Sequence, residues 1–113
     1  MCDPDPAEIE RRTYAAIAAI RAVFGAKGDE DGATLFVSHH LEELEESYWT
    51  ERVQKPSPKP SDVLDLLIRS PDWDPEEDGI DRIDFTLPGD VTNYVLCVEF
   101  DAAGKVQQIV MES

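Results

Sequence analysis

The sequence has little cysteine, few basic residues and no long apolar run. Its two cysteines, Cys2 and Cys97, are separated by a spacing that fits no metal site. Only 10 residues are Lys or Arg against 25 Asp or Glu, so the net charge of −15 disfavours binding to nucleic acid or to an anionic membrane. No segment approaches the roughly 20 apolar residues that span a bilayer, and a basic segment followed by an apolar run is missing. We therefore expect a cytoplasmic protein that needs no disulfide.

The C-terminal third has the pattern of an antiparallel sheet between residues 80 and 112. Apolar and polar residues alternate from Arg82 to Leu87, which is typical of a half-buried strand. A second run, from Thr92 to Phe100, is rich in β-branched and aromatic residues. The segment 101–104 then suits a tight turn that ends in a left-handed glycine and brings Lys105 back to begin a third strand.

This turn predicts which residues of the last two strands face each other. Both faces of the sheet would then be apolar, and each face would need a cover. The chain's own helices could supply both covers, or a homodimer could form through the second sheet face or through the Ala-rich first helix. The predicted pairs are Phe100 with Val106, Val98 with Gln108 and Leu96 with Val110 on one face, and Cys97 with Ile109 and Val95 with Met111 on the other.

Three helices are expected ahead of this sheet. The first begins with a capping box, in which Asp5 is the N-cap and Glu8 reaches back to it. The pattern as a whole predicts a single α+β domain, with three N-terminal helices packed on a C-terminal three-stranded antiparallel meander. The expected elements are a tail at 1–5, helices at 6–24, 34–53 and 61–69, a proline-rich spacer at 55–60 and the sheet at 80–112.

Acidic residues gather in two stretches, one on the second expected helix and one in the loop before the sheet. Such a field attracts a basic partner and raises its association rate, and aromatic residues beside it are typical interface anchors. The alternative is that the charge only keeps the protein soluble and the aromatic residues are core. The candidate partner-binding residues are Glu42, Glu43, Glu45, Glu46, Trp49, Asp72, Trp73, Asp74, Glu76, Glu77 and Asp78.

A different reading of the second helix makes it a catalytic or metal-binding element. His39, His40 and Glu43 could supply imidazole and carboxylate groups, which would suit a metal-dependent or hydrolytic enzyme. Two adjacent histidines point about 100° apart on a helix, however, and the spacing of a helical zinc site is missing. His40 lies on the apolar stripe and is most simply a core residue, so no cofactor and no metal ion are expected.

Three segments of the chain resemble a known family. Ser38–Leu44, Asp81–Val95 and Met111–Ser113 are similar to a family of small acidic bacterial proteins classed as a domain of unknown function. The similarity runs from about Thr34 to the end, and Asp84–Pro88 is its most specific part. The family has no established catalytic residues to transfer. Proteins of this kind often resemble immunity proteins, which implies a non-enzymatic acidic inhibitor of a basic toxin.

Overall fold

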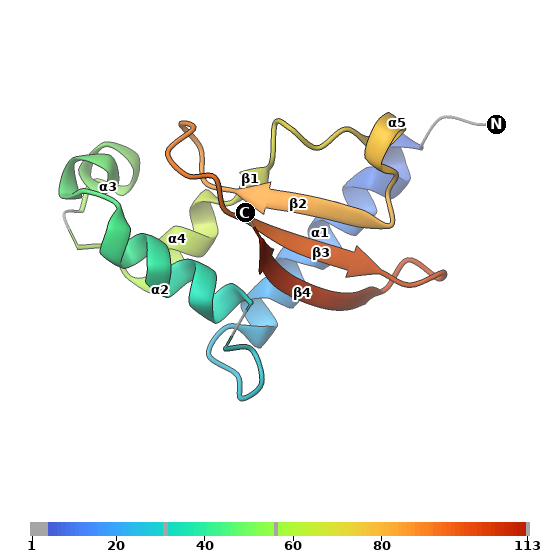
Figure 1. The fold of residues 1–113 in the computed structure, drawn as a ribbon, viewed down its shortest axis with the longest axis horizontal. Helices are drawn as coiled ribbons and strands as arrows, with labels where there is room; N and C mark the ends of the chain where they lie inside the picture. The colour runs from blue at the N-terminus through green and yellow to red at the C-terminus, as the bar shows by residue number, and fades with distance from the viewer. Residues whose placement is uncertain (1–4, 31, 56, 113) are drawn as a thin grey trace.

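The computed structural model describes residues 5–30, 32–55 and 57–112. Helices dominate the first half of the chain and an antiparallel sheet the second half, with α1 crossing behind the sheet (Figure 1). None of the helices in these ranges is long and apolar enough to cross a membrane. The elements are α1 (Pro6–Val23), α2 (Ala33–Glu43), α3 (Glu46–Val53), α4 (Pro60–Leu66), β1 (Ile68–Arg69), α5 (Pro75–Asp78), β2 (Arg82–Thr86), β3 (Val95–Phe100) and β4 (Val106–Glu112).

The predicted α+β class is confirmed, but the structure has more elements than the sequence suggested. The described residues form five helices and a four-stranded sheet in the order β1-β2-β3-β4, against three helices and three strands in the prediction. The predicted first helix is present, and the Asp5 carboxylate accepts a hydrogen bond from the Ala7 amide at 3.0 Å, as an N-cap does. Residues 1–4 of the predicted tail and Pro56 of the predicted spacer lie outside the described ranges.

The predicted helix 34–53 is two helices with a bend between them. Leu44 and Glu45 have extended backbone angles, with ψ of 143° and 156°, so α2 ends at Glu43 and α3 starts anew at Glu46. The bend turns α3 away from the axis of α2 (Figure 1) while Trp49 still reaches the core. Helical periodicity alone did not reveal this break, because the residues at the bend are ordinary helix formers.

The predicted helix 61–69 starts one residue earlier than expected and ends before its last three residues. The Lys59 amide donates to the Asp62 carboxylate at 2.8 Å, which caps α4 at Lys59. Ile68 and Arg69 are extended instead of helical, and they pair with Thr86 and Phe85 to form the edge strand β1. The short helix α5 then occupies the acidic loop that precedes β2.

A β-bulge changes the predicted register of the last hairpin. The turn itself is confirmed: the Asp101 amide donates to the Lys105 carbonyl at 2.8 Å, and Gly104 has a φ of 80°. Beyond the confirmed pair Phe100–Val106, Glu99 pairs with Gln108, so Gln107 has no opposite residue. The predicted pairs Val98–Gln108, Leu96–Val110, Cys97–Ile109 and Val95–Met111 are wrong, because the structure pairs Val98 with Ile109, Leu96 with Met111, Cys97 with Val110 and Val95 with Glu112.

The bulge gives the sheet one apolar face and one largely polar face. A shift of one residue moves Ile109 and Met111 to the inner face, where they pack against the hydrophobic core with α1 and α2. On the outer face, the Arg82 guanidinium contacts Asp84 at 3.3 Å and Glu112 at 3.1 Å. The prediction of a second apolar face is therefore wrong. A homodimer through that face was expected mainly because the face would be apolar, so this reason no longer holds.

Cys97 lies on this largely polar outer face, but its side chain is buried. The pKa of its thiol is raised to about 12, mainly because burial disfavours the charged thiolate. Because the thiolate is the nucleophile, we expect Cys97 to resist alkylation in the folded protein and to react stoichiometrically in denaturant. The measurement is mass spectrometry after iodoacetamide treatment of a Cys2→Ser variant, in which Cys97 is the remaining thiol. Rapid labelling of the folded variant would contradict the packing described here.

Candidate functional site: an acidic groove beside α2 and α3

A groove of about 370 Å³ lies at the bend between α2 and α3. Its apolar lining comes from Leu44, Tyr48 and Val91, the last contributed by the loop between β2 and β3. Three exposed carboxylates, those of Glu43, Glu45 and Glu51, line the same groove. The bend is what makes this arrangement, since it brings the end of one helix and the start of the next around a single hollow.

The loop that carries Val91 is held against α3 by two contacts. The Tyr48 hydroxyl donates a hydrogen bond to the Pro88 carbonyl at 2.8 Å. The Arg52 guanidinium lies 5.4 Å from the centre of the Tyr48 ring, and it approaches Gly89 so closely that a Cβ there would lie 2.6 Å from its Nη2. Gly89 also has a φ of 97°, so both space and backbone conformation favour glycine at this position.

His40 holds the same loop against α2. Its side chain is only 1% exposed, and its Nδ1–H donates to the Phe36 carbonyl at 2.6 Å. The other ring nitrogen, Nε2, therefore accepts from the Thr92 hydroxyl at 2.9 Å in the neutral imidazole. Burial lowers the pKa of His40, which favours this neutral form. The interpretation of His40 as a core residue is confirmed.

The three residues of the enzyme hypothesis do not converge on one point. Both ring nitrogens of His40 are engaged, the His39 ring packs edge-on against Tyr94 with 4.8 Å between centroids, and Glu43 lines the groove. Within the described ranges, no three His, Cys, Asp or Glu side chains are grouped so that they could hold a metal ion. The arrangement therefore gives His40 a role in fixing the loop.

The buried state of His40 predicts a pH dependence of stability. The folded pKa lies below the ordinary value near 6.5, so its contribution is complete above pH 6.5 and is lost as pH falls through the folded pKa. In urea unfolding, the free energy of unfolding should fall more between pH 7.5 and pH 5.5 in the wild-type protein than in His40→Gln. His39→Gln keeps the buried imidazole of His40, so its free energy of unfolding should fall as much as that of the wild-type protein. Equal losses in all three proteins would contradict the assignment.

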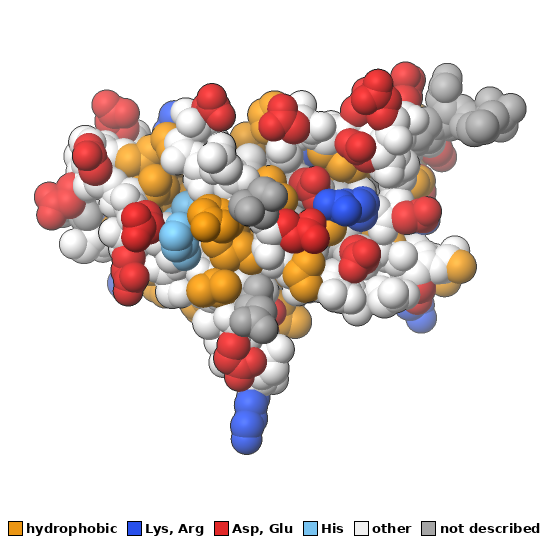
Figure 2. Space-filling view, viewed as in Figure 1, with side chains coloured by type: hydrophobic (Ala, Val, Ile, Leu, Met, Phe, Trp, Pro, Cys, Tyr) orange, Lys and Arg blue, Asp and Glu red, His pale blue; other side chains and the backbone are white. Residues whose placement is uncertain are grey.

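The structure separates the two acidic stretches that the sequence suggested as one surface. The first lies beside the α2–α3 bend, whereas Asp74, Glu76, Glu77 and Asp78 lie at α5, at the other end of a molecule 47 Å long (Figure 1). Figure 2 shows acidic side chains at both ends of one face. Asp72 belongs to neither group, since it lines a different pocket. A single partner contact through all eleven predicted residues is therefore a poor fit to this geometry.

The two tryptophans of the predicted surface are buried. Trp49 is 2% exposed and Trp73 is 8% exposed, and both belong to the hydrophobic core. The Trp73 Nε1–H donates to the Arg82 carbonyl at 2.8 Å, which ties the acidic loop to β2. Neither ring offers a free face of the size that an interface anchor needs. The groove instead presents Tyr48, Leu44 and Val91 as its apolar contacts.

The glutamates of the groove have no basic partner among the residues that the structure describes. The ion pairs between the described residues use other acids, including Glu8, Asp62 and Asp84. Unpaired carboxylates retain their full field, which attracts cations and repels anions. Glu42, Glu43, Glu45 and Glu46 are among the predicted partner-binding residues, whereas Glu51 and Val91, which line the groove, are not. Glu51 lies in the same helical run and could have been included; Val91 depends on the path of a loop.

In comparisons with known proteins, no family model, no curated protein and no solved structure matches this chain. The resemblance to small acidic bacterial proteins stays a prediction from the sequence. The geometry of the groove is therefore the main basis for a functional proposal.

Proposed function

We propose that this protein is a non-enzymatic, cytoplasmic binding domain that uses the acidic groove to hold a basic protein. The observation that carries the proposal is the grouping of three exposed, unpaired carboxylates, those of Glu43, Glu45 and Glu51, around an apolar hollow. Glu42 and Glu46 flank the groove in the sequence and add to its negative field.

The groove suits a lysine or arginine side chain better than it suits an apolar one. The aliphatic stem of such a side chain would pack on Leu44, Tyr48 and Val91, and its cationic end would reach the carboxylates around them. Charge-assisted hydrogen bonds of this kind are roughly twice as strong as neutral ones. The partner is therefore a protein with an exposed basic residue inside a basic surface.

More specifically, we propose that the protein is an immunity-type inhibitor that binds and covers a basic toxin. The net charge of −15 and the resemblance to immunity proteins support this form. An acidic inhibitor of this kind would associate quickly at low salt and more slowly as screening increases, because steering depends on the range of the field.

The test is affinity capture of the tagged protein at low salt from a lysate of its own organism, with salt elution and mass spectrometry. Three baits are compared: wild type, Glu43→Lys with Glu51→Lys, and Glu76→Lys with Glu77→Lys as a control at the far end. Each double variant changes the net charge by the same amount. We expect a strongly basic protein to be recovered by the wild type and the control and lost from the groove variant.

Two outcomes would contradict the proposal. The first is recovery of only the bait itself by all three proteins. The second is equal loss from both double variants, which would mean that the overall charge and not the groove holds the partner. Circular dichroism and thermal melting of each bait would show that the variants remain folded.

A further inference from the structure

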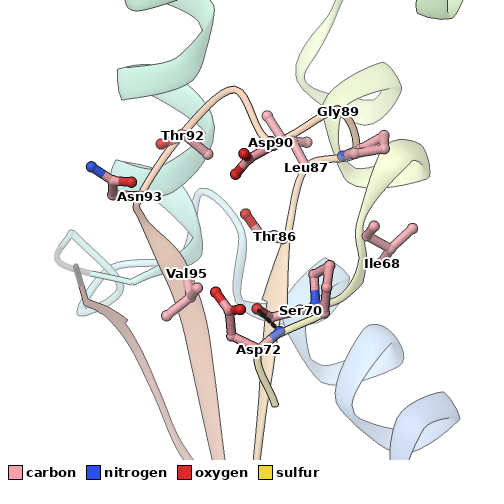
Figure 3. Close-up of a pocket in the computed structure, with 12 residues that line it drawn as sticks. Ile68, Ser70, Asp72, Thr86, Leu87, Gly89, Asp90, Thr92, Asn93 and Val95 are labelled. Carbon is pink, nitrogen blue, oxygen red and sulfur yellow. Dashed lines mark hydrogen bonds between the residues drawn. The ribbon is translucent and has the colours of Figure 1, made fainter.

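The loop between β2 and β3 forms one wall of the acidic groove and is fixed near both of its ends. Near its start, the Tyr48 hydroxyl donates a hydrogen bond to the Pro88 carbonyl at 2.8 Å. Near its end, the Thr92 hydroxyl donates to the His40 imidazole at 2.9 Å, and Figure 3 shows this hydroxyl on the side of the loop that faces α2. Val91, which the loop contributes to the groove, lies between these two attachments. The position of this wall therefore depends on both of them.

The attachment to His40 fits the neutral imidazole better than the charged one. The Thr92 hydroxyl accepts a hydrogen bond from the Tyr94 amide at 3.1 Å and gives its own proton to Nε2 of His40. In the imidazolium, Nε2 also carries a proton, so the Thr92 proton loses this acceptor. The ring is 1% exposed, so the added charge is also shielded from water. Protonation therefore favours a conformation in which the His40 ring and Thr92 separate.

The nearby acidic side chains leave His40 without an ion pair. The ion pairs between the described residues include none with His40. Glu43 lies three residues further along α2 and lines the groove. Asp90 is the acidic residue of the loop, and its carboxylate is directed toward Thr86 (Figure 3). A positive charge on His40 is therefore not compensated by a contact within this part of the structure.

The other titratable and basic groups around His40 do not stabilise a charge on it either. His39 lies beside it with 5.1 Å between the ring centroids, and the Tyr94 ring lies at 6.1 Å. Arg52 of α3 lies at the other end of the loop, against Gly89. Burial is the main cause that lowers the pKa of His40, and His39 lowers it further, whereas the hydrogen bond to the Phe36 carbonyl raises it.

We propose that the loop between β2 and β3 is a pH-controlled wall of the acidic groove, which is released when His40 takes up a proton. In the released state the imidazolium turns toward water and Val91 leaves the groove, while the hydrogen bond between Tyr48 and Pro88 still tethers the loop. A bound partner then loses the apolar contact of Val91 and dissociates more readily. This consequence for a partner rests on the proposed function, but the opening of the loop is a property of the free protein.

The test is hydrogen exchange of the Tyr94 amide, followed by NMR on the free protein between pH 7.5 and pH 5.5. This amide donates to Thr92, so its protection factor reports the separation of the loop from His40. Opening restores an ordinary pKa of about 6.5 to the ring, so it becomes up to about tenfold more frequent over this range. We expect the Tyr94 protection factor to fall about threefold to tenfold in the wild-type protein and in His39→Gln, but not in His40→Gln.

The Asp101 amide is the control within the same spectra. It donates to the Lys105 carbonyl in the last turn, far along the chain from His40, and its protection factor should stay constant. A constant protection factor at Tyr94 in the wild-type protein would overturn the proposal, as would an equal fall at Asp101 or in His40→Gln. If His40→Gln does not fold, the comparison of Tyr94 with Asp101 in the wild-type protein still decides. Failure to capture a basic partner would contradict the proposed function and would leave these exchange rates unchanged.

Discussion

Replacing Arg12 by methionine is expected to lower the free energy of unfolding by about 3 kcal/mol. Arg12 is 8% exposed and connects α1 to the sheet: its Nη1–H donates to the Ile80 carbonyl at 2.6 Å and its Nε–H to the Glu8 carboxylate at 2.7 Å. The guanidinium also lies 5.4 Å from the centre of the Phe100 ring. Methionine keeps the apolar stem but removes the Arg12 donor from the Ile80 carbonyl and leaves the Glu8 carboxylate with Arg11 alone. Urea unfolding followed by circular dichroism measures the loss.

Arg11 provides the matched control for this prediction. It binds the same Glu8 carboxylate, but its side chain is 51% exposed, and exposed ion pairs contribute little. Arg11→Met should therefore cost much less stability than Arg12→Met. Arg12→Lys should lose much of the stability as well, because an ammonium group cannot reproduce the two divergent bonds of the guanidinium. Equal effects of Arg11→Met and Arg12→Met would show that burial of Arg12 does not matter.

Insertion of one residue after Gln107 is expected to lower the free energy of unfolding by about 3 kcal/mol or more. If the bulge keeps one unpaired residue, Gln108 and the residues after it shift by one position along β3. Ile109 and Met111 would then face the polar outer side, while Gln108 and Val110 would face the core. The protein can avoid this only by leaving two residues of β4 unpaired, which has its own cost. Chemical unfolding of the insertion variant tests the expectation.

Deletion of Gln107 provides the matched control. It removes the unpaired residue and leaves Gln108 opposite Glu99 and Ile109 opposite Val98, so the deletion should cost far less stability than the insertion. Gln107 is exposed, so Gln107→Ala should change stability by less than about 0.5 kcal/mol. An insertion variant as stable as Gln107→Ala would contradict the register described here. An insertion variant that becomes dimeric would indicate that the apolar outer face produced by the shift needs a cover.

Features set by adjacent residues were predictable from the sequence. The Asp5 cap depends on residues within one helical turn, and the Gly104 turn depends on four consecutive positions. The inner positions Ile83 and Phe85 followed from simple alternation along β2. In each case a local steric or hydrogen-bonding preference decides the conformation, so tertiary contacts do not need to be known.

Features set by contacts between distant segments were not predictable in the same way. The bend at Leu44 allows α3 to turn while Trp49 stays buried, and the bulge at Gln107 aligns Ile109 and Met111 with the core. The strand β1 has only two residues, and it exists because Ile68 and Arg69 meet β2. Periodicity within one segment contains no information about such partners.

The candidate site was also predictable only where it depends on adjacent residues. Glu42, Glu43, Glu45 and Glu46 were identified from the sequence, because a run of acids on a helix is visible there, whereas Glu51 was not. Whether two acidic runs form one surface is a question of tertiary structure, and the structure places the α5 group at the far end of the molecule. The burial of Trp49 and Trp73 likewise depends on packing, since an aromatic residue beside acidic ones can anchor an interface or belong to the core.

The most direct test of the acidic groove is to map the contact with the basic protein recovered by capture. Two-dimensional NMR spectra of the isotope-labelled domain would be recorded with increasing amounts of the unlabelled partner. The account predicts that the largest changes occur at residues 43–51 and at Val91, and that they decrease as salt screens the charges. Changes centred on α5, or on the outer face of the sheet around Arg82, would contradict it.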